Sequence, residues 1–164
     1  MLFRSSSALT DNICLANSPA GLINVTAAPN WILRSLTGAS ASPGASCVPI
    51  SRDIWFRAVV PYNGEIHVMT RQHNNPTASL NINRSMVQIF TASTCSTGLA
   101  QVACNADGAA GLHAYAFASG LTPGSTVYIR LAKVNDPVNP APSTLVQMAV
   151  TNGLYWTGAA DNNF

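Results

Sequence analysis

The stretch that most constrains the fold begins at Asp53 and reads Asp-Ile-Trp-Phe-Arg-Ala-Val-Val. β-Branched and aromatic residues dominate it, which is typical of a strand, and a turn-forming Pro61-Tyr-Asn-Gly64 follows directly. Side chains alternate between the two faces of a strand, so one face would carry Ile54, Phe56, Ala58 and Val60, and the other Trp55, Arg57 and Val59. We expect this stretch to be a central strand of a β-sandwich, joined through the Asn63-Gly64 turn to a second strand in a hairpin.

Short segments with the same features recur along the chain. They cover residues 22–26, 31–34, 65–70, 79–83, 86–91, 99–104, 113–118, 126–133 and 145–151. Turns rich in glycine, proline and asparagine separate them, and no segment has convincing helical periodicity. In 113–118, large and small residues alternate, as they do in a strand with one packed face. The pattern predicts an all-β fold, an antiparallel β-sandwich of about eight strands, jelly-roll-like or immunoglobulin-like.

The chain has four cysteines, Cys14, Cys47, Cys95 and Cys104. None belongs to a closely spaced pair of the kind that binds zinc. An even number at wide spacing favours two disulfides and therefore an oxidising compartment, although four buried free thiols in a cytosolic protein are the alternative. Three pairings are possible, of which we favour Cys14–Cys47 with Cys95–Cys104.

The composition fits an extracellular module better than a cytosolic enzyme. Charged residues make up only 9% of the chain, against roughly 25% in an average soluble protein. The arginines are scattered singly, so no basic stripe indicates nucleic-acid binding. No apolar run approaches the roughly 20 residues of a membrane span. Residues 1–7 lack the apolar core of a signal peptide. We therefore interpret the chain as an excerpt of a longer polypeptide, and Met1 does not establish where that polypeptide begins.

Several short motifs follow one another in a fixed order. They are Cys14, Cys47, Asp53-Ile-Trp-Phe, Val87-Gln-Ile-Phe, Cys95, Val102-Ala-Cys104-Asn-Ala-Asp107 and Gly120-Leu-Thr-Pro-Gly-Ser-Thr-Val-Tyr-Ile-Arg130. In this order they resemble the β-sandwich modules of large secreted and cell-surface proteins of Bacteroidota, similar to bacterial pre-peptidase C-terminal domains. The likeness covers residues 11–152, with 1–10 as an irregular lead-in. Residues 153–164 would be a linker, or the opening of a following module.

Calcium is the only cofactor that the sequence brings into consideration. Asp53, Asn105 and Asp107, together with Asp11 and Asn12, could supply the oxygen ligands that calcium prefers. No calcium-loop spacing supports such a site, and turn formation is the alternative role of these side chains. The modules that the chain resembles often have a doubled acid after the second cysteine, where this chain has Asn105-Ala-Asp107.

The aromatic residues suggest either core packing or ligand binding. For the neighbouring Trp55 and Phe56, we expect one side chain in the core and the other under a loop. Trp31 and Trp156 lie outside the clearest strands, and an exposed one could stack on the face of a sugar. The three histidines are far apart and the acids are dispersed, so no catalytic residues are predicted.

These observations lead to two functional hypotheses. The first is a non-catalytic structural or adhesive module of a large secreted or cell-surface bacterial protein, such as a repeat in a surface filament or a gliding-type adhesin. Its partners would be neighbouring modules of the same polypeptide or surface assembly. The alternative is an accessory domain that holds a secreted hydrolase against polysaccharide or protein. An exposed aromatic platform would favour the alternative.

Overall fold

The computed structural model describes residues 13, 14, 16, 21–73, 80–106, 113–137 and 142–153. The predicted lead-in over 1–10 lies outside these ranges, as does the predicted tail apart from its first residue, Gly153. Within them the protein is all-β, with eight strands: β1 (Ile32–Ser35), β2 (Ile50–Val59), β3 (Ile66–Gln72), β4 (Ser85–Thr91), β5 (Ala100–Asn105), β6 (Tyr115–Ala118), β7 (Thr126–Val134) and β8 (Leu145–Thr151). The predicted antiparallel β-sandwich is confirmed.

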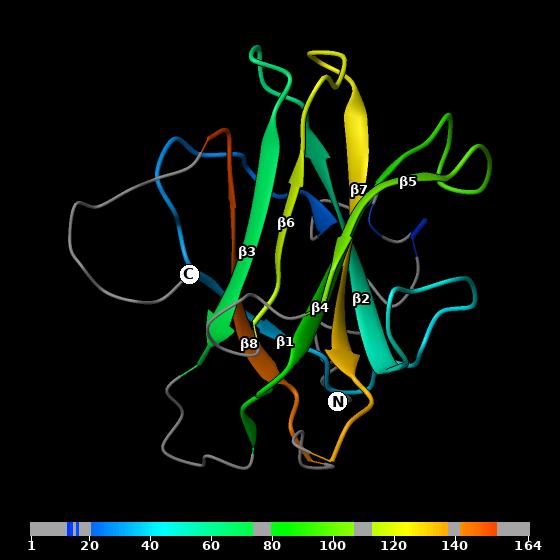
Figure 1. The fold of residues 1–164 in the computed structure, drawn as a ribbon, viewed down its shortest axis with the longest axis vertical. Helices are drawn as coiled ribbons and strands as arrows, with labels where there is room; N and C mark the ends of the chain where they lie inside the picture. The colour runs from blue at the N-terminus through cyan, green and yellow to red at the C-terminus, as the bar shows by residue number, and fades with distance from the viewer. Residues whose placement is uncertain are drawn as a thin grey trace, which may run out of the picture.

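The strands form two four-stranded antiparallel sheets (Figure 1). One has the order β1-β8-β3-β6 and the other β2-β7-β4-β5. Each strand of the first half thus pairs with its counterpart counted from the end, β1 with β8, β2 with β7, β3 with β6 and β4 with β5. This is the winding of a long hairpin folded at β4–β5, which makes the fold a jelly roll and not an immunoglobulin sandwich.

The position predicted for the Asp53–Val60 stretch is wrong. β2 is the edge strand of its sheet, and β7 holds the interior position beside it. Part of the free edge of β2 is occupied by loop backbone, because the Asp53 amide donates to Ser40 O at 3.1 Å and the Ile23 amide donates to Arg57 O at 2.9 Å. The strand signal was strong because both faces of β2 are buried, which does not require two strand neighbours.

The predicted hairpin between β2 and β3 is also wrong, since the two strands belong to different sheets. The turn at 61–64 instead carries the chain across the end of the sandwich. Gly64 adopts φ +71° there, and its carbonyl accepts a hydrogen bond from the Leu121 amide at 3.0 Å. The hairpin that does form is β4–β5, whose connection projects from the sandwich in Figure 1.

The main hydrophobic core lies between the two sheets. It contains Ile54, Phe56 and Ala58 from β2, which the alternation predicted to share one face. The 113–118 segment, which includes β6, contributes Ala114, Ala116 and Ala118 to the core, so its packed face is the small-residue face. The large side chains of β6 therefore point away from the core.

Two predicted strands are present only as single bridges. Leu22 and Thr26 pair in parallel with Arg57 and Thr151, so the 22–26 segment passes from one sheet to the other. Within 79–83, only the Asn81–Leu145 bridge forms among the residues described. In the same described part of the chain, no helix is long and apolar enough to cross a membrane.

Candidate functional site

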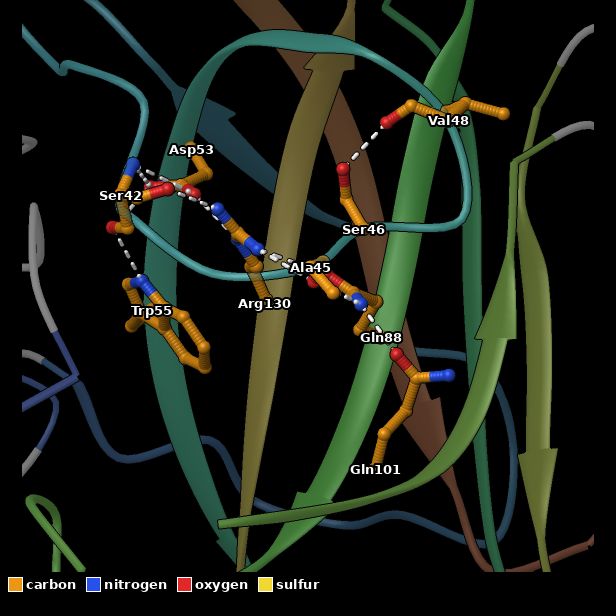
Figure 2. A network of polar contacts seen from close by, with 9 residues as sticks. All are labelled: Ser42, Ala45, Ser46, Val48, Asp53, Trp55, Gln88, Gln101 and Arg130. Atoms are coloured by element: carbon orange, nitrogen blue, oxygen red, sulfur yellow. Dashed lines mark hydrogen bonds and ion pairs between the residues drawn. The ribbon is translucent and has the colours of Figure 1, made fainter.

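The outer face of the β2-β7-β4-β5 sheet carries a buried polar network around Arg130 (Figure 2). Arg130 is only 1% exposed, and its Nε donates to Asp53 Oδ2, a carboxylate that is itself fully buried. Arg130 Nη2 donates to Ser42 O at 2.7 Å, and its Nη1 donates to Gln88 Oε1 at 3.2 Å. The guanidinium thus joins strands β2, β4 and β7 to the loop that precedes β2.

That loop is held in place by the same network. Ser42 Oγ donates to Asp53 Oδ1 at 2.7 Å and accepts the indole N–H of Trp55 at 2.9 Å. Gln88 Nε2 donates to Ala45 O at 3.1 Å. Because a buried charge is tolerated only when it is paired and hydrogen-bonded, the network requires the loop to be present. Its chemistry is therefore structural, since the Asp53 carboxylate is already occupied by its partners.

The same outer face also carries an apolar cluster. Trp55 packs against Phe90 with ring centroids 5.4 Å apart, and Ile13 and Ala16 from the N-terminal segment join the same cluster. Phe56, by contrast, belongs to the inter-sheet core. The prediction that these neighbouring aromatics are split between the core and a covered outer surface is confirmed.

Two disulfides join the covering segments to the β4–β5 hairpin. Cys14 is bonded to Cys95, and Cys47 is bonded to Cys104. The existence of two disulfides is confirmed, but the pairing of Cys14 with Cys47 and of Cys95 with Cys104 is wrong. Cys104 lies four residues along β5 from Ala100, a distance of roughly 13 Å at strand spacing, whereas Cys95 lies beyond the end of the ladder. Cys95 and Cys104 are therefore separated by more than the reach of a disulfide, which is about 7 Å between Cα atoms.

The outer face of the other sheet, β1-β8-β3-β6, differs because no described element covers it. We call this surface the open face. Alternation along the strands places these side chains on it: Leu33, His67, Met69, Arg71, Tyr115, Phe117, Gln147 and Ala149. Leu33 is 44% exposed and Phe117 is 43% exposed. Leu33 and Phe117 lie on the two opposite edge strands of the sheet, so they are separate exposed apolar side chains and not one apolar patch.

The side chains of the open face hold one another in position. The Arg71 guanidinium carbon lies 4.3 Å from the centroid of the Trp31 ring, and Arg71 Nε donates to Gln147 Oε1 at 2.6 Å. Trp31, a predicted sugar-stacking residue, therefore has one ring face occupied by a cation. Trp156, the other predicted stacking residue, lies outside the described residues.

A histidine and a tyrosine form a pair at the β6 side of the open face. His67 Nδ1 lies 2.7 Å from the Tyr115 hydroxyl, and its ring centroid lies 4.5 Å from that of Phe117. His67 Nε2 lies 3.8 Å from Glu65 Oε2. Burial lowers the pKa of His67, an effect that Glu65 partly offsets. Burial, assisted by the charge of Glu65, raises the pKa of Tyr115. The phenol is therefore a neutral hydrogen-bonding group at physiological pH.

The candidate calcium ligands do not gather among the described residues. Asp53 lies on edge strand β2 and Asn105 on the opposite edge strand β5. Asn105 Oδ1 accepts from the Tyr115 amide at 3.3 Å, a contact that links β5 to β6 of the other sheet. Asp107, Asp11 and Asn12 lie outside the described residues. In the part of the chain that is described, no group of three or more His, Cys, Asp or Glu side chains could hold a metal ion.

Sequence reasoning did not identify the Arg130 network or the exposed rings of β6. Arg130 was visible as a charge in the middle of an apolar strand, on the same face as Tyr128 and Ala132. Its pairing with Asp53 depends on β2 and β7 being neighbours, which only the topology provides.

Comparison with models of known protein families, with curated proteins and with solved structures finds no match to this chain.

Proposed function

We propose that this chain is a non-catalytic structural or adhesive module of a large secreted or cell-surface bacterial protein. The observation that carries the proposal is the use of both disulfides to fix covering segments onto one sheet face. Such crosslinks are compatible with an extracellular location, where disulfides persist. A module built this way resists local opening, which suits a load-bearing or adhesive role outside the cell.

The use of the charged residues supports the same proposal. The buried ion pair between Asp53 and Arg130 serves to anchor the loop before β2. Among the described residues, the most enzyme-like arrangement is Glu65–His67–Tyr115, which combines a histidine of lowered pKa with a tyrosine of raised pKa. An activated tyrosine nucleophile would need the opposite shift in its pKa. The neighbours of such a module would be further modules of the same polypeptide or surface assembly.

The cellular location gives a direct test. An antibody raised against the folded chain, applied to intact cells of the organism that encodes it, should label the cell surface or the secreted fraction. A matched sample of permeabilised cells controls for the total amount of antigen. Labelling that appears only after permeabilisation would overturn the proposal.

A second candidate function is favoured by a different observation. The open face carries Phe117 at 43% exposure and, two rows further along the strands, polar side chains that are already held in position. This arrangement supports the binding of carbohydrate or protein by an accessory domain of a secreted hydrolase. The two functions share the same fold and differ in whether the open face has a ligand.

A further inference from the structure

We propose that the open face binds a neutral oligosaccharide chain, with the ring of Phe117 as its stacking platform. This inference rests on the proposed adhesive function and deepens it by naming the ligand class and the surface. Three features of the open face support it: how the side chains are arranged across the four strands, how they are held, and what charges they carry.

The side chains of the open face form rows across the sheet. One row contains Phe117 and His67, and the next contains Tyr115, Met69 and Ala149. A third row contains Arg71, Gln147 and Leu33. From β6 to β1 the face spans three strand intervals, about 14 Å. This width suits an extended chain of sugar rings better than a single sugar.

The open face carries rings in its first two rows and planar polar groups in the third. Sugar rings present an apolar C–H face, which packs on an aromatic ring, and hydroxyl groups at their edges, which need donors and acceptors. Phe117 offers an exposed ring, while the Arg71–Gln147 pair offers planar hydrogen-bonding groups. A mainly apolar protein partner would leave these polar groups desolvated without matching partners.

The key groups are fixed before any ligand arrives. His67 is 3% exposed and packs beside the Phe117 ring, and the Tyr115 hydroxyl binds its Nδ1 at 2.7 Å. Arg71 is restrained between the Trp31 ring and the Gln147 amide. Binding therefore costs little additional side-chain entropy, which is the main requirement for a weakly interacting ligand such as a sugar.

The open face also contains a buried polar atom without a hydrogen bond. His67 Nε2 is buried and makes no hydrogen bond with the described residues, although Glu65 Oε2 lies 3.8 Å away. A buried polar group of this kind usually has a partner such as an ordered water, and because the atom is buried it is not itself a contact point for a ligand. The charges here balance, with Arg71 positive and Glu65 negative, so the face complements a neutral glycan rather than an acidic one.

The test is a titration of the folded chain followed by two-dimensional amide NMR spectra. The probes are neutral oligosaccharides of glucose, mannose, xylose, galactose and N-acetylglucosamine, with oligogalacturonate as the acidic comparison. We expect at least one neutral probe to shift the amide signals of β3, β6 and β8, and oligogalacturonate to bind no more tightly. Absence of shifts with every neutral probe, or shifts confined to other strands, would overturn the inference.

A pair of matched variants tests the platform. Phe117→Ser should weaken binding about tenfold, because the stacking ring is lost. Val102→Ser is the control, since Val102 lies on the edge strand of the other sheet and is 42% exposed. Amide spectra of both variants confirm that they fold. Equal affinity of Phe117→Ser and the unmodified chain would reject the platform.

The outcomes separate this inference from the proposed function. If no neutral glycan binds while the antibody labels the cell surface, the glycan site is rejected and the structural module stands. If labelling is confined to permeabilised cells, the module proposal fails whatever the titration shows.

Discussion

Arg130 and Asp53, 77 residues apart in the chain, form an ion pair that is almost completely buried on the outer face of a sheet. Neither residue lies in the core between the sheets. The pair is buried because the loop before β2 covers it, and the loop is held there by its own hydrogen bonds to both partners. The ion pair and the loop therefore stabilise each other, so a change in either should be felt by both.

Removal of one partner should be strongly destabilising. In Arg130→Met, the Asp53 carboxylate stays buried without its charge partner, and we expect the free energy of unfolding to fall by about 3–5 kcal/mol. The measurement is urea unfolding followed by tryptophan fluorescence. As a control, Arg71→Met removes an exposed arginine of the other sheet and should cost about 1 kcal/mol or less.

The double variant Asp53→Asn/Arg130→Met isolates the pair itself. Because it removes both charges, it should be less destabilised than the sum of the two single variants. Additive losses of unfolding free energy would show that the two side chains act independently, which would contradict the ion pair between them.

The disulfide pairing can be tested by trypsin digestion without reduction. Cleavage after arginine places Cys14 in residues 5–34, Cys47 in 35–52, and both Cys95 and Cys104 in 85–130. Cys14–Cys95 with Cys47–Cys104 should hold all three peptides in one covalent species. The pairing favoured from sequence would instead release 85–130 as a separate peptide with an internal disulfide. A further cut after Leu99 distinguishes the third possible pairing.

Loss of the disulfides should lower stability by an amount set by loop length. The bridges close loops with sequence separations of 81 and 57 residues. The chain-entropy model gives about 4 kcal/mol for each loop taken alone. We expect Cys47→Ser/Cys104→Ser to lower the melting temperature of the oxidised protein clearly, and a reductant to lower it further. A melting temperature unchanged by reduction would contradict a stabilising role for these bonds.

Substitution of Gly64 tests the turn at 61–64, which carries the chain across the end of the sandwich. An alanine Cβ at this position would lie 2.7 Å from Leu121 O, and the backbone has φ +71°. Gly124 has a similar φ of +79° but open space around its Cβ position. Gly124→Ala should therefore cost only the conformational penalty, about 1–2 kcal/mol, and Gly64→Ala should cost more in the same urea titration. Equal losses of unfolding free energy in the two variants would show that the turn at Gly64 is not packed against Leu121.

Much of the fold followed from local patterns. The alternation in Asp53–Val60 correctly placed Phe56 on one face with Ile54 and Ala58, and the turn signals delimited strands close to those observed. Local patterns do not specify which strands pair, however. The jelly roll places β2 beside β7 and β3 in the opposite sheet, so both the central position and the hairpin predicted from Asn63-Gly64 were wrong. The cysteine pairing failed for the same reason.

The candidate site was less predictable than the fold. Trp31 was named as a residue that could stack on a sugar if exposed, but its contact with Arg71 links the residue before β1 to β3, across their common neighbour β8. Phe117 was overlooked because a large residue alternating with alanines normally indicates a large-residue core face. In this protein the opposing sheet supplies the large side chains of the core, and the alanines of β6 face that sheet.

The pH dependence of stability provides the last test, because it reports on His67. Burial lowers the pKa of His67 in the folded protein, and the neighbouring titratable groups are Glu65 and Tyr115. The unfolded chain therefore binds a proton more readily, near the ordinary histidine pKa of about 6.5. The stabilisation is complete above that pH and is lost as the pH falls toward the lower folded pKa. His67→Gln keeps an acceptor for the Tyr115 hydroxyl but does not titrate, so its melting temperature should fall less between pH 7 and about pH 5. The difference between the two proteins removes the contribution of the carboxylates they share. Parallel falls in both would show that His67 is not the group that destabilises the fold in acid.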